Sequence, residues 1–126
     1  MRDHRVPDEW PHPLDGVIAD PDHHRVLFEN ERVRVVETIV RAGETTPLHT
    51  HVLPTVLYAI SGSHFVRRDV RGEVLVDTRN LEPPFVMPPI QWSEGTPEHT
   101  LENPGPADLV VIGVELKDQT TDYRAY

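Results

Sequence analysis

Proline occurs along most of this chain and is the feature that most restricts its fold. The 126 residues include 13 prolines and only 7 glycines. A proline inside a helix removes a backbone hydrogen bond and clashes with the preceding turn. After Pro21 the longest proline-free windows are residues 22–46 and 55–82, and neither has the hydrophobic period of a helix. The proline distribution therefore excludes a helical bundle.

Short stretches with the alternation of β-strands occupy much of these windows. In residues 32–40, Val33, Val35 and Ile39 share one parity, and Arg32 and Arg34 share the other. Turn residues separate such stretches, which is typical of an all-β sandwich or barrel. Besides residues 32–40, the predicted strands cover residues 55–61, 64–68, 74–77 and 108–116, with a short edge strand over residues 83–89.

The length of the chain corresponds to one domain. A chain of 126 residues buries about two-thirds of its unfolded surface, so it needs neither a disulfide nor a metal to fold. Residues 1–25 contain four prolines, many charges and few branched apolar side chains, which predicts an N-terminal arm. We expect a single domain over residues 26–126.

The charge balance restricts the partners. Lysine plus arginine number 12 and aspartate plus glutamate number 21, giving a net charge of −9. An acidic surface repels phosphate backbones and anionic membranes, so we expect neither nucleic acid nor membrane as a partner. The chain has no cysteine and no apolar signal-peptide core, and we therefore expect a cytoplasmic protein.

Histidine is frequent for a chain without cysteine, with 8 residues. On a strand, His49 and His51 point to one face, with about 6.5–7 Å between their backbone positions, and can converge on one ion. His23 and His24 are neighbours that face opposite ways on an extended chain, so they cannot bind one ion together. We interpret four histidines of the arm as structural: His4, His12, His23 and His24.

The spacing around His49 and His51 resembles the first motif of the cupin superfamily, G-x5-H-x-H-x(3,4)-E-x6-G. Gly43, His49, His51 and Gly62 match that motif in register. His99 and Asn103 match the H-x3-N end of the second motif. In this second motif Gly95 lies one residue farther from the histidine than in the family pattern, and the proline spacing also differs.

This resemblance covers about the last hundred residues and implies a small single-domain cupin, an RmlC-like jelly-roll barrel also called a double-stranded β-helix. It implies that His49, His51 and His99 bind a divalent metal ion at the mouth of the barrel. The glutamate ligand of the family motif falls on Thr55. Three neutral imidazoles would leave the ion its full charge, which suits an anionic or chelating substrate.

Four further residues are candidates for the pocket. Thr55 and Gln91 have strand parities that can face inward, and His64 follows the motif glycine Gly62 on a strand that can line the barrel. Tyr58 is a large amphipathic group on the same strand as Thr55, although its parity is the opposite one. We expect packing to be the main role of Tyr58, and a hydrogen-bonded structural role for His64.

Three functions remain open from the sequence. The first is a metal-dependent, dioxygenase-like enzyme that uses Fe(II), or else Mn, Ni or Zn, on a small chelating organic substrate. The second is a non-catalytic binder of a small molecule or a metal, and the third is a degenerate cupin with a structural role. No residue is assigned to catalysis. We also expect a homodimer, to which the arm and the apolar last strand contribute.

Overall fold

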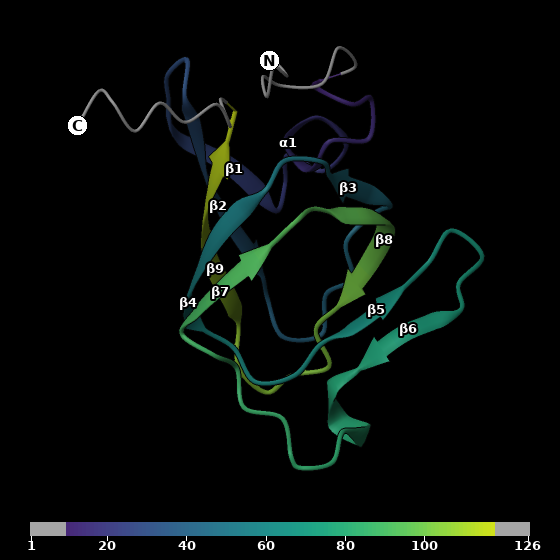
Figure 1. The fold of residues 1–126 in the computed structure, drawn as a ribbon. Helices are drawn as coiled ribbons and strands as arrows, with labels where there is room; N and C mark the ends of the chain where they lie inside the picture. Colours follow the sequence, from purple (N-terminus) through teal and green to yellow (C-terminus); the bar gives the residue numbers. More distant parts are fainter. Residues whose placement is uncertain (1–9, 118–126) are drawn as a thin grey trace.

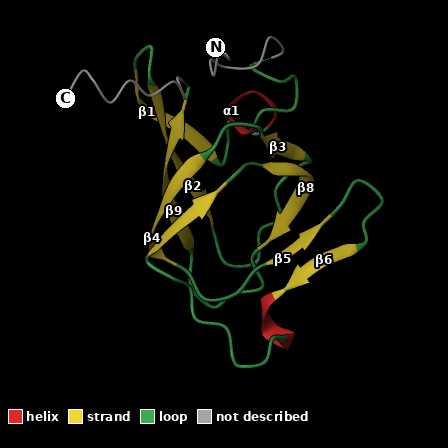
Figure 2. Cartoon of the chain, in the orientation of Figure 1, coloured by secondary structure: helices red, strands yellow, loops and turns green. Residues whose placement is uncertain are grey.

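The computed structural model describes residues 10–117, which form two antiparallel sheets that face each other (Figures 1 and 2). The five-stranded sheet has the order β1-β2-β9-β4-β7, and the four-stranded sheet has the order β3-β8-β5-β6. The first sheet comprises β1 (His24–Glu29), β2 (Val33–Val40), β9 (Leu109–Leu116), β4 (Thr55–Ser61) and β7 (Ile90–Ser93). The second comprises β3 (His49–His51), β8 (Thr96–Glu102), β5 (Val66–Arg68) and β6 (Val74–Asp77).

Helix is confined to two short pieces, α1 (Gly16–Ala19) and the 3₁₀ turn η1 (Thr78–Asn80), within the described part of the chain. The predicted all-β fold is therefore confirmed. Strands β4 and β6 have the predicted bounds, and β2, β5 and β9 lie within theirs. The predicted edge strand over residues 83–89 is wrong, because this stretch has no strand. Its four prolines lack the N–H groups that a ladder requires.

The inward face of β2 carries Arg34, Val36 and Val40, all of them buried. Val33, Val35 and Ile39 occupy the opposite face and are half-buried. An arginine can face the interior here because Asp15 and Glu115 accept hydrogen bonds from its guanidinium group. Arg34 Nη2 donates to the two carboxylate oxygens of Asp15 at 2.8 and 3.0 Å.

This ion pair attaches the segment before β1 to the barrel. Asp15 is fully buried, and the backbone N–H of Thr50 in β3 donates to Leu14 O at 2.8 Å. The Arg34 guanidinium also lies 4.9 Å from the centre of the Trp10 ring. Residues 10–23 of the expected arm thus pack against the end of the barrel where β3 lies (Figure 1). Residues 1–9 of the arm, with His4, and residues 118–126 lie outside the described residues.

The end of β8 is held by the motif asparagine. Asn103 is buried, and its Nδ2 donates to Val40 O at 2.8 Å and to Ala107 O at 2.9 Å. Its Oδ1 accepts a hydrogen bond from the backbone N–H of Gly105. Asn103 therefore shapes the turn between β8 and β9 and does not reach the pocket.

The buried apolar core is small because polar side chains occupy much of the interior. Its members are Val36, Val40, Leu53, Val66 and Leu109. The buried polar side chains include His24, His49 and His99. No helix within residues 10–117 has the length and apolar character needed to cross a membrane.

Candidate metal centre and pocket

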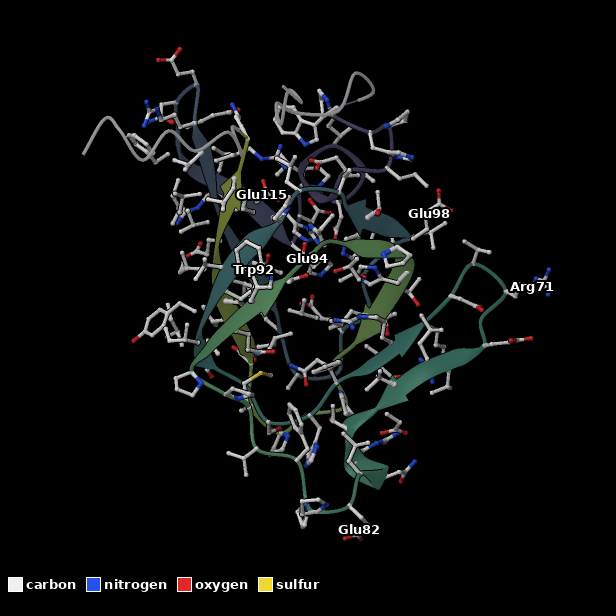
Figure 3. The ribbon with its side chains drawn as sticks, viewed as in Figure 1. Arg71, Glu82, Trp92, Glu94, Glu98 and Glu115 are labelled. Carbon is white, nitrogen blue, oxygen red and sulfur yellow. The ribbon has the colours of Figure 1, made fainter. Side chains whose placement is uncertain are left out.

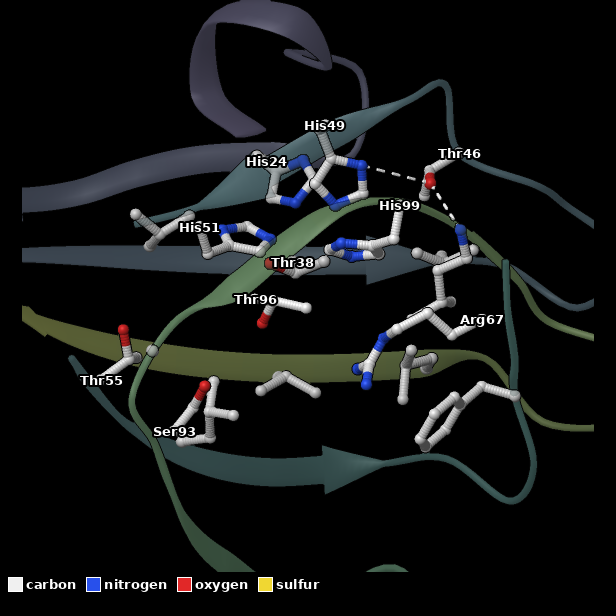
Figure 4. A pocket seen from close by; sticks show the side chains of 18 of the residues that line it. His24, Thr38, Thr46, His49, His51, Thr55, Arg67, Ser93, Thr96 and His99 are labelled. Atoms are coloured by element: carbon white, nitrogen blue, oxygen red, sulfur yellow. Dashed lines mark hydrogen bonds between the residues drawn. The ribbon is translucent and has the colours of Figure 1, made fainter. Parts of the chain in front are cut away.

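Four histidine rings come together at one end of the space between the sheets (Figure 4). His49 and His51 lie on β3, His99 lies on β8 and His24 begins β1. His49 and His99 are direct partners across the β3–β8 pair, which brings their rings to a centroid distance of 4.4 Å. The structure thus brings together all three ligands predicted from the sequence and adds a fourth histidine.

The most compact group of potential ligands consists of His24, His49 and His51. Each offers one ring nitrogen, and these three atoms lie within 4.8 Å of one another. The ring centroid of His24 lies 4.7 Å from that of His49 and 5.2 Å from that of His51. His99 borders this group, with its ring centroid 5.8 Å from that of His51.

His24 is the site residue that sequence reasoning missed. It is 3% exposed and points into the pocket, whereas His23 contacts Asp20 and Glu44. The two neighbours do face different ways, as expected, but His24 lies among the potential ligands of the pocket, a position that its interpretation as an arm residue did not include. The pairing of His24 with Thr38 in β2 carries its ring to the site. That pairing depends on contacts distant in sequence, and the motif spacing contains no signal for it.

Backbone carbonyl oxygens fix the orientation of three of the rings. The Nδ1 atom of His49 lies 2.9 Å from Pro47 O, that of His99 lies 2.6 Å from Pro97 O, and that of His24 lies 3.0 Å from Asp20 O. Because a carbonyl oxygen can only accept, each Nδ1 carries the proton and each Nε2 keeps a free lone pair. Metal-binding histidines are commonly oriented by such contacts.

Two observations indicate that an ion fits among these rings. The Nε2 atom of His24 is buried and has no hydrogen-bond partner, a costly state that a bound cation would relieve. Gly16 of α1 lies so close that a Cβ atom there would be 2.8 Å from His51 Cε1 and 3.0 Å from His24 Nε2. The site therefore has the donor chemistry of a divalent-metal centre and is closed on one side by α1.

The four imidazoles are neutral near pH 7. Burial lowers the pKa of His24 and of His99 to about 4 each, and it lowers the pKa of His49 as well. The pKa of His51 lies well below its usual value, first through burial and then through the charge of His49. Neutral imidazole is the form that binds a metal, so these rings need not lose a proton to do so at neutral pH.

The histidines form one wall of a cavity of about 150 Å³. Of the four pocket candidates, Thr55 and Gln91 line this cavity, and Tyr58 and His64 do not. Tyr58 is 51% exposed on the outer face of β4, the face that its parity indicated. His64 lies within hydrogen-bonding distance of Thr78, with 3.0 Å between its Nδ1 and Thr78 Oγ1.

Thr55 occupies the position of the glutamate in the family motif. It is buried and lines the cavity, but its hydroxyl donates to Leu53 O at 2.9 Å. Threonine has no carboxylate, and this short-range bond engages the hydroxyl that it has instead. Outward-pointing side chains flank the site elsewhere, including Trp92 and Glu98 (Figure 3).

Comparisons with solved structures identify the architecture. A cupin domain from Bordetella pertussis Tohama I aligns with a TM-score of 0.58 and 22% identity, over 75% of this chain and 91% of that chain. An RmlC-like cupin family protein with a double-stranded β-helix fold, from Methanocaldococcus jannaschii, aligns with a TM-score of 0.53 and 15% identity, over 75% and 79%. Neither protein-family models nor curated protein sequences match the chain. At these identities the comparisons show the fold, which is the predicted cupin double-stranded β-helix.

Proposed function

We propose that this protein binds a divalent metal ion through His24, His49 and His51, with His99 as a fourth ligand, and acts on a small chelating organic molecule. The main supporting observation is that His24, His49 and His51 each offer a ring nitrogen within 4.8 Å of the others, and that Nε2 of His24 is buried without a hydrogen-bond partner. Fe(II) is the ion that we favour, and Mn, Ni and Zn are alternatives, because imidazole nitrogen suits these metals.

The residues of the chain supply three properties to such a centre. Neutral imidazoles bind the ion without offsetting its charge, and the carbonyl oxygens of Pro47 and Pro97 hold two of the rings in place. Apolar side chains of Leu57 and Val111 line the cavity and limit the access of water. When bound, a divalent ion supplies a Lewis acid, and Fe(II) also supplies redox chemistry with dioxygen. A dioxygenase-like enzyme is the activity that we propose.

A second candidate is a non-catalytic binder of a small molecule or a metal. It is favoured by the lack of an unengaged carboxylate in the cavity: among the described residues, Glu115 is the one acidic group in the lining, and Arg34 already donates to it. In an enzyme that needs a general base, the substrate or a ligand of the ion would therefore have to act as that base. A degenerate cupin with a structural role is the third reading.

Metal analysis of the purified protein, followed by anaerobic Fe(II) titration, tests the metal centre. We expect one ion per chain in the wild type and little in His24→Ala or His49→Ala. The matched control is His23→Ala, which removes the neighbouring imidazole outside the cavity and should keep the ion. Equal metal content in all four proteins would contradict the proposal.

Oxygen uptake separates the enzyme from the binder. The Fe(II)-loaded wild type is tested with a panel of dicarbonyl compounds, thiols and small organic acids. Consumption of oxygen together with one compound supports the enzyme, and stoichiometric binding without consumption supports the binder. We also propose that the protein is located in the cytoplasm, because the chain has no cysteine.

A further inference from the structure

Arg67 places a positive charge inside the cavity. It lies on β5 opposite Leu101 of β8, and both side chains line the cavity. Figure 4 shows the guanidinium group projecting into the space below His99 and Thr96. Its central carbon is 5.2 Å from the centre of the Phe65 ring, another lining side chain. The arginine is therefore directed inward and not toward solvent.

In the described part of the chain this guanidinium group has no ion-pair partner, and it contacts the Phe65 ring. Its Nε atom is buried and makes no hydrogen bond. Within residues 10–117 the arginines that form ion pairs are Arg25, Arg34, Arg68 and Arg79, and Arg67 is not among them. A buried charge without a partner is costly, and proteins normally pair such a group with an acid or a bound anion.

The described residues offer no free acid to neutralise Arg67. The cavity carboxylate, that of Glu115, accepts a hydrogen bond from Arg34. Burial lowers the pKa of Arg67, and no acidic neighbour among residues 10–117 opposes this effect. The Arg67 charge also contributes, after burial, to the low pKa of both His49 and His99. The arginine and the histidines therefore share one electrostatic environment.

We propose that Arg67 is the anion-binding residue of the cavity and that the ligand is a small organic acid, whose carboxylate binds the Arg67 guanidinium while a second donor group reaches the histidine centre. The second contact rests on the proposed metal function, and the first does not. A guanidinium group presents paired N–H donors that match the two oxygens of a carboxylate. The cavity of about 150 Å³ suits a small acid, with a part of about the size of benzene inside the pocket.

Carboxylate binding to metal-free protein tests the first contact. The probe is butyrate, and the matched neutral probe is butyramide, each followed by NMR chemical-shift titration. We expect butyrate to shift resonances of cavity residues and butyramide to bind about tenfold or more weakly, because hydrogen bonds to charged groups are the stronger ones. Equal affinity for the two probes would overturn the proposal.

Two variants of Arg67 and one control complete the test. Arg67→Met keeps the length and apolar stem and should lose about tenfold or more of the butyrate affinity. Arg67→Lys keeps the charge and should retain part of it. Arg68→Met is the control, because Arg68 pairs with Glu102 and does not line the cavity. Butyrate binding that is unchanged in Arg67→Met would overturn the assignment.

Thermal melting of the metal-free variants shows whether a loss of butyrate binding comes from a loss of folding. Since Arg67 is half-buried and its Nε atom is buried without a partner within residues 10–117, Arg67→Met should melt no lower than the wild type. A clearly lower melting temperature would show that Arg67 has a stabilising partner within the protein, which contradicts its role as a free anion receptor.

The metal-loaded protein tests the second contact with succinate, which has a carboxylate at each end. We expect the bound ion to strengthen succinate binding, and Arg67→Met to weaken it. If the protein binds no ion but butyrate still depends on Arg67, the proposed metal function fails and the anion site stands. If the ion binds but neither acid depends on Arg67, the anion site fails and the metal function stands.

Discussion

Gly16 is the residue at which α1 approaches the histidines most closely. A Cβ atom at this position would meet His51 at 2.8 Å and His24 at 3.0 Å, and the Nδ1 contact of His24 to Asp20 O limits how far that ring can move. The absence of a side chain therefore permits the histidine arrangement. The need for glycine at position 16 comes from this close packing against His24 and His51, and not from its backbone angles.

We expect Gly16→Ala to weaken metal binding about 10- to 100-fold, as for changes to groups that orient metal ligands. Isothermal titration with Zn²⁺ measures this effect. Ile18→Ala on the exposed side of the same helix is the control and should bind like the wild type. Wild-type affinity in Gly16→Ala would show that the rings are free to move, contrary to this account.

The histidines also make the stability of the metal-free protein depend on pH. His24 and His99 have folded pKa values of about 4, below the 6.5 of an unfolded histidine. Between these values the unfolded state binds more protons, so stability is full above about pH 6.5 and is lost as pH falls toward 4. We expect the free energy of unfolding to drop by a few kcal/mol over this range.

Urea unfolding at a series of pH values measures this loss. His99→Gln should show a shallower decline than the wild type, because one of the groups that titrate between pH 6.5 and 4 is removed. A wild-type free energy of unfolding that stays constant from pH 7 to 4 would contradict the burial of neutral histidines.

At the scale of elements, the segment before β1 is held by one buried charge network. Asp15 and Glu115 both accept from Arg34, which joins the segment to β2 and β9. The parallel bridge of Asp15 to Thr50 adds a contact with β3. Since His24 follows this segment directly, the network determines where β1 enters the site.

Asp15→Ala should destabilise the protein by about 3 kcal/mol, because it removes one partner of a buried arginine. It should also weaken metal binding, because α1 and the start of β1 lose their attachment. Chemical unfolding and metal titration check the two effects. Asp22→Ala, an exposed acid in the same segment, should change neither. An Asp15→Ala protein as stable as the wild type would contradict the role of the network.

The sequence predicted some elements better than others for identifiable reasons. The strands over residues 55–61 and 74–77 depend on local alternation, which their residues contain. The convergence of His49 with His99 was available from the family motifs. The contribution of His24 was not, because it depends on the pairing of β1 with β2 across the sheet. The inward direction of Arg34 depends on Asp15 and Glu115, which lie far from it in sequence.

At the scale of the molecule, the outer face of β4 and β7 is unusually apolar. Val56 pairs with Trp92 and Tyr58 pairs with Ile90 across these strands, and all four side chains are exposed. These four side chains carry no charge, which favours contact between two copies of this acidic chain there, although Glu94 accepts a hydrogen bond from Trp92 at the edge of this face. The last strand, β9, lies between β2 and β4, so it has no free edge with which to extend a sheet.

We therefore expect a homodimer that buries the outer face of β4 and β7. Analytical ultracentrifugation should find a dimer for the wild type and a monomer for Tyr58→Glu, since the new charge would be buried. Val74→Glu changes an exposed apolar residue on the other sheet and should stay dimeric. A wild-type monomer at all concentrations would exclude this interface.

The central claim is that His24, His49 and His51 bind one divalent ion. X-ray diffraction from crystals grown with Zn²⁺, recorded at the zinc absorption edge, tests it most directly. We expect one anomalous peak per chain, at about 2.0–2.1 Å from a ring nitrogen of each of these three histidines. A peak bound elsewhere, or no peak between the rings at saturating zinc, would contradict the account.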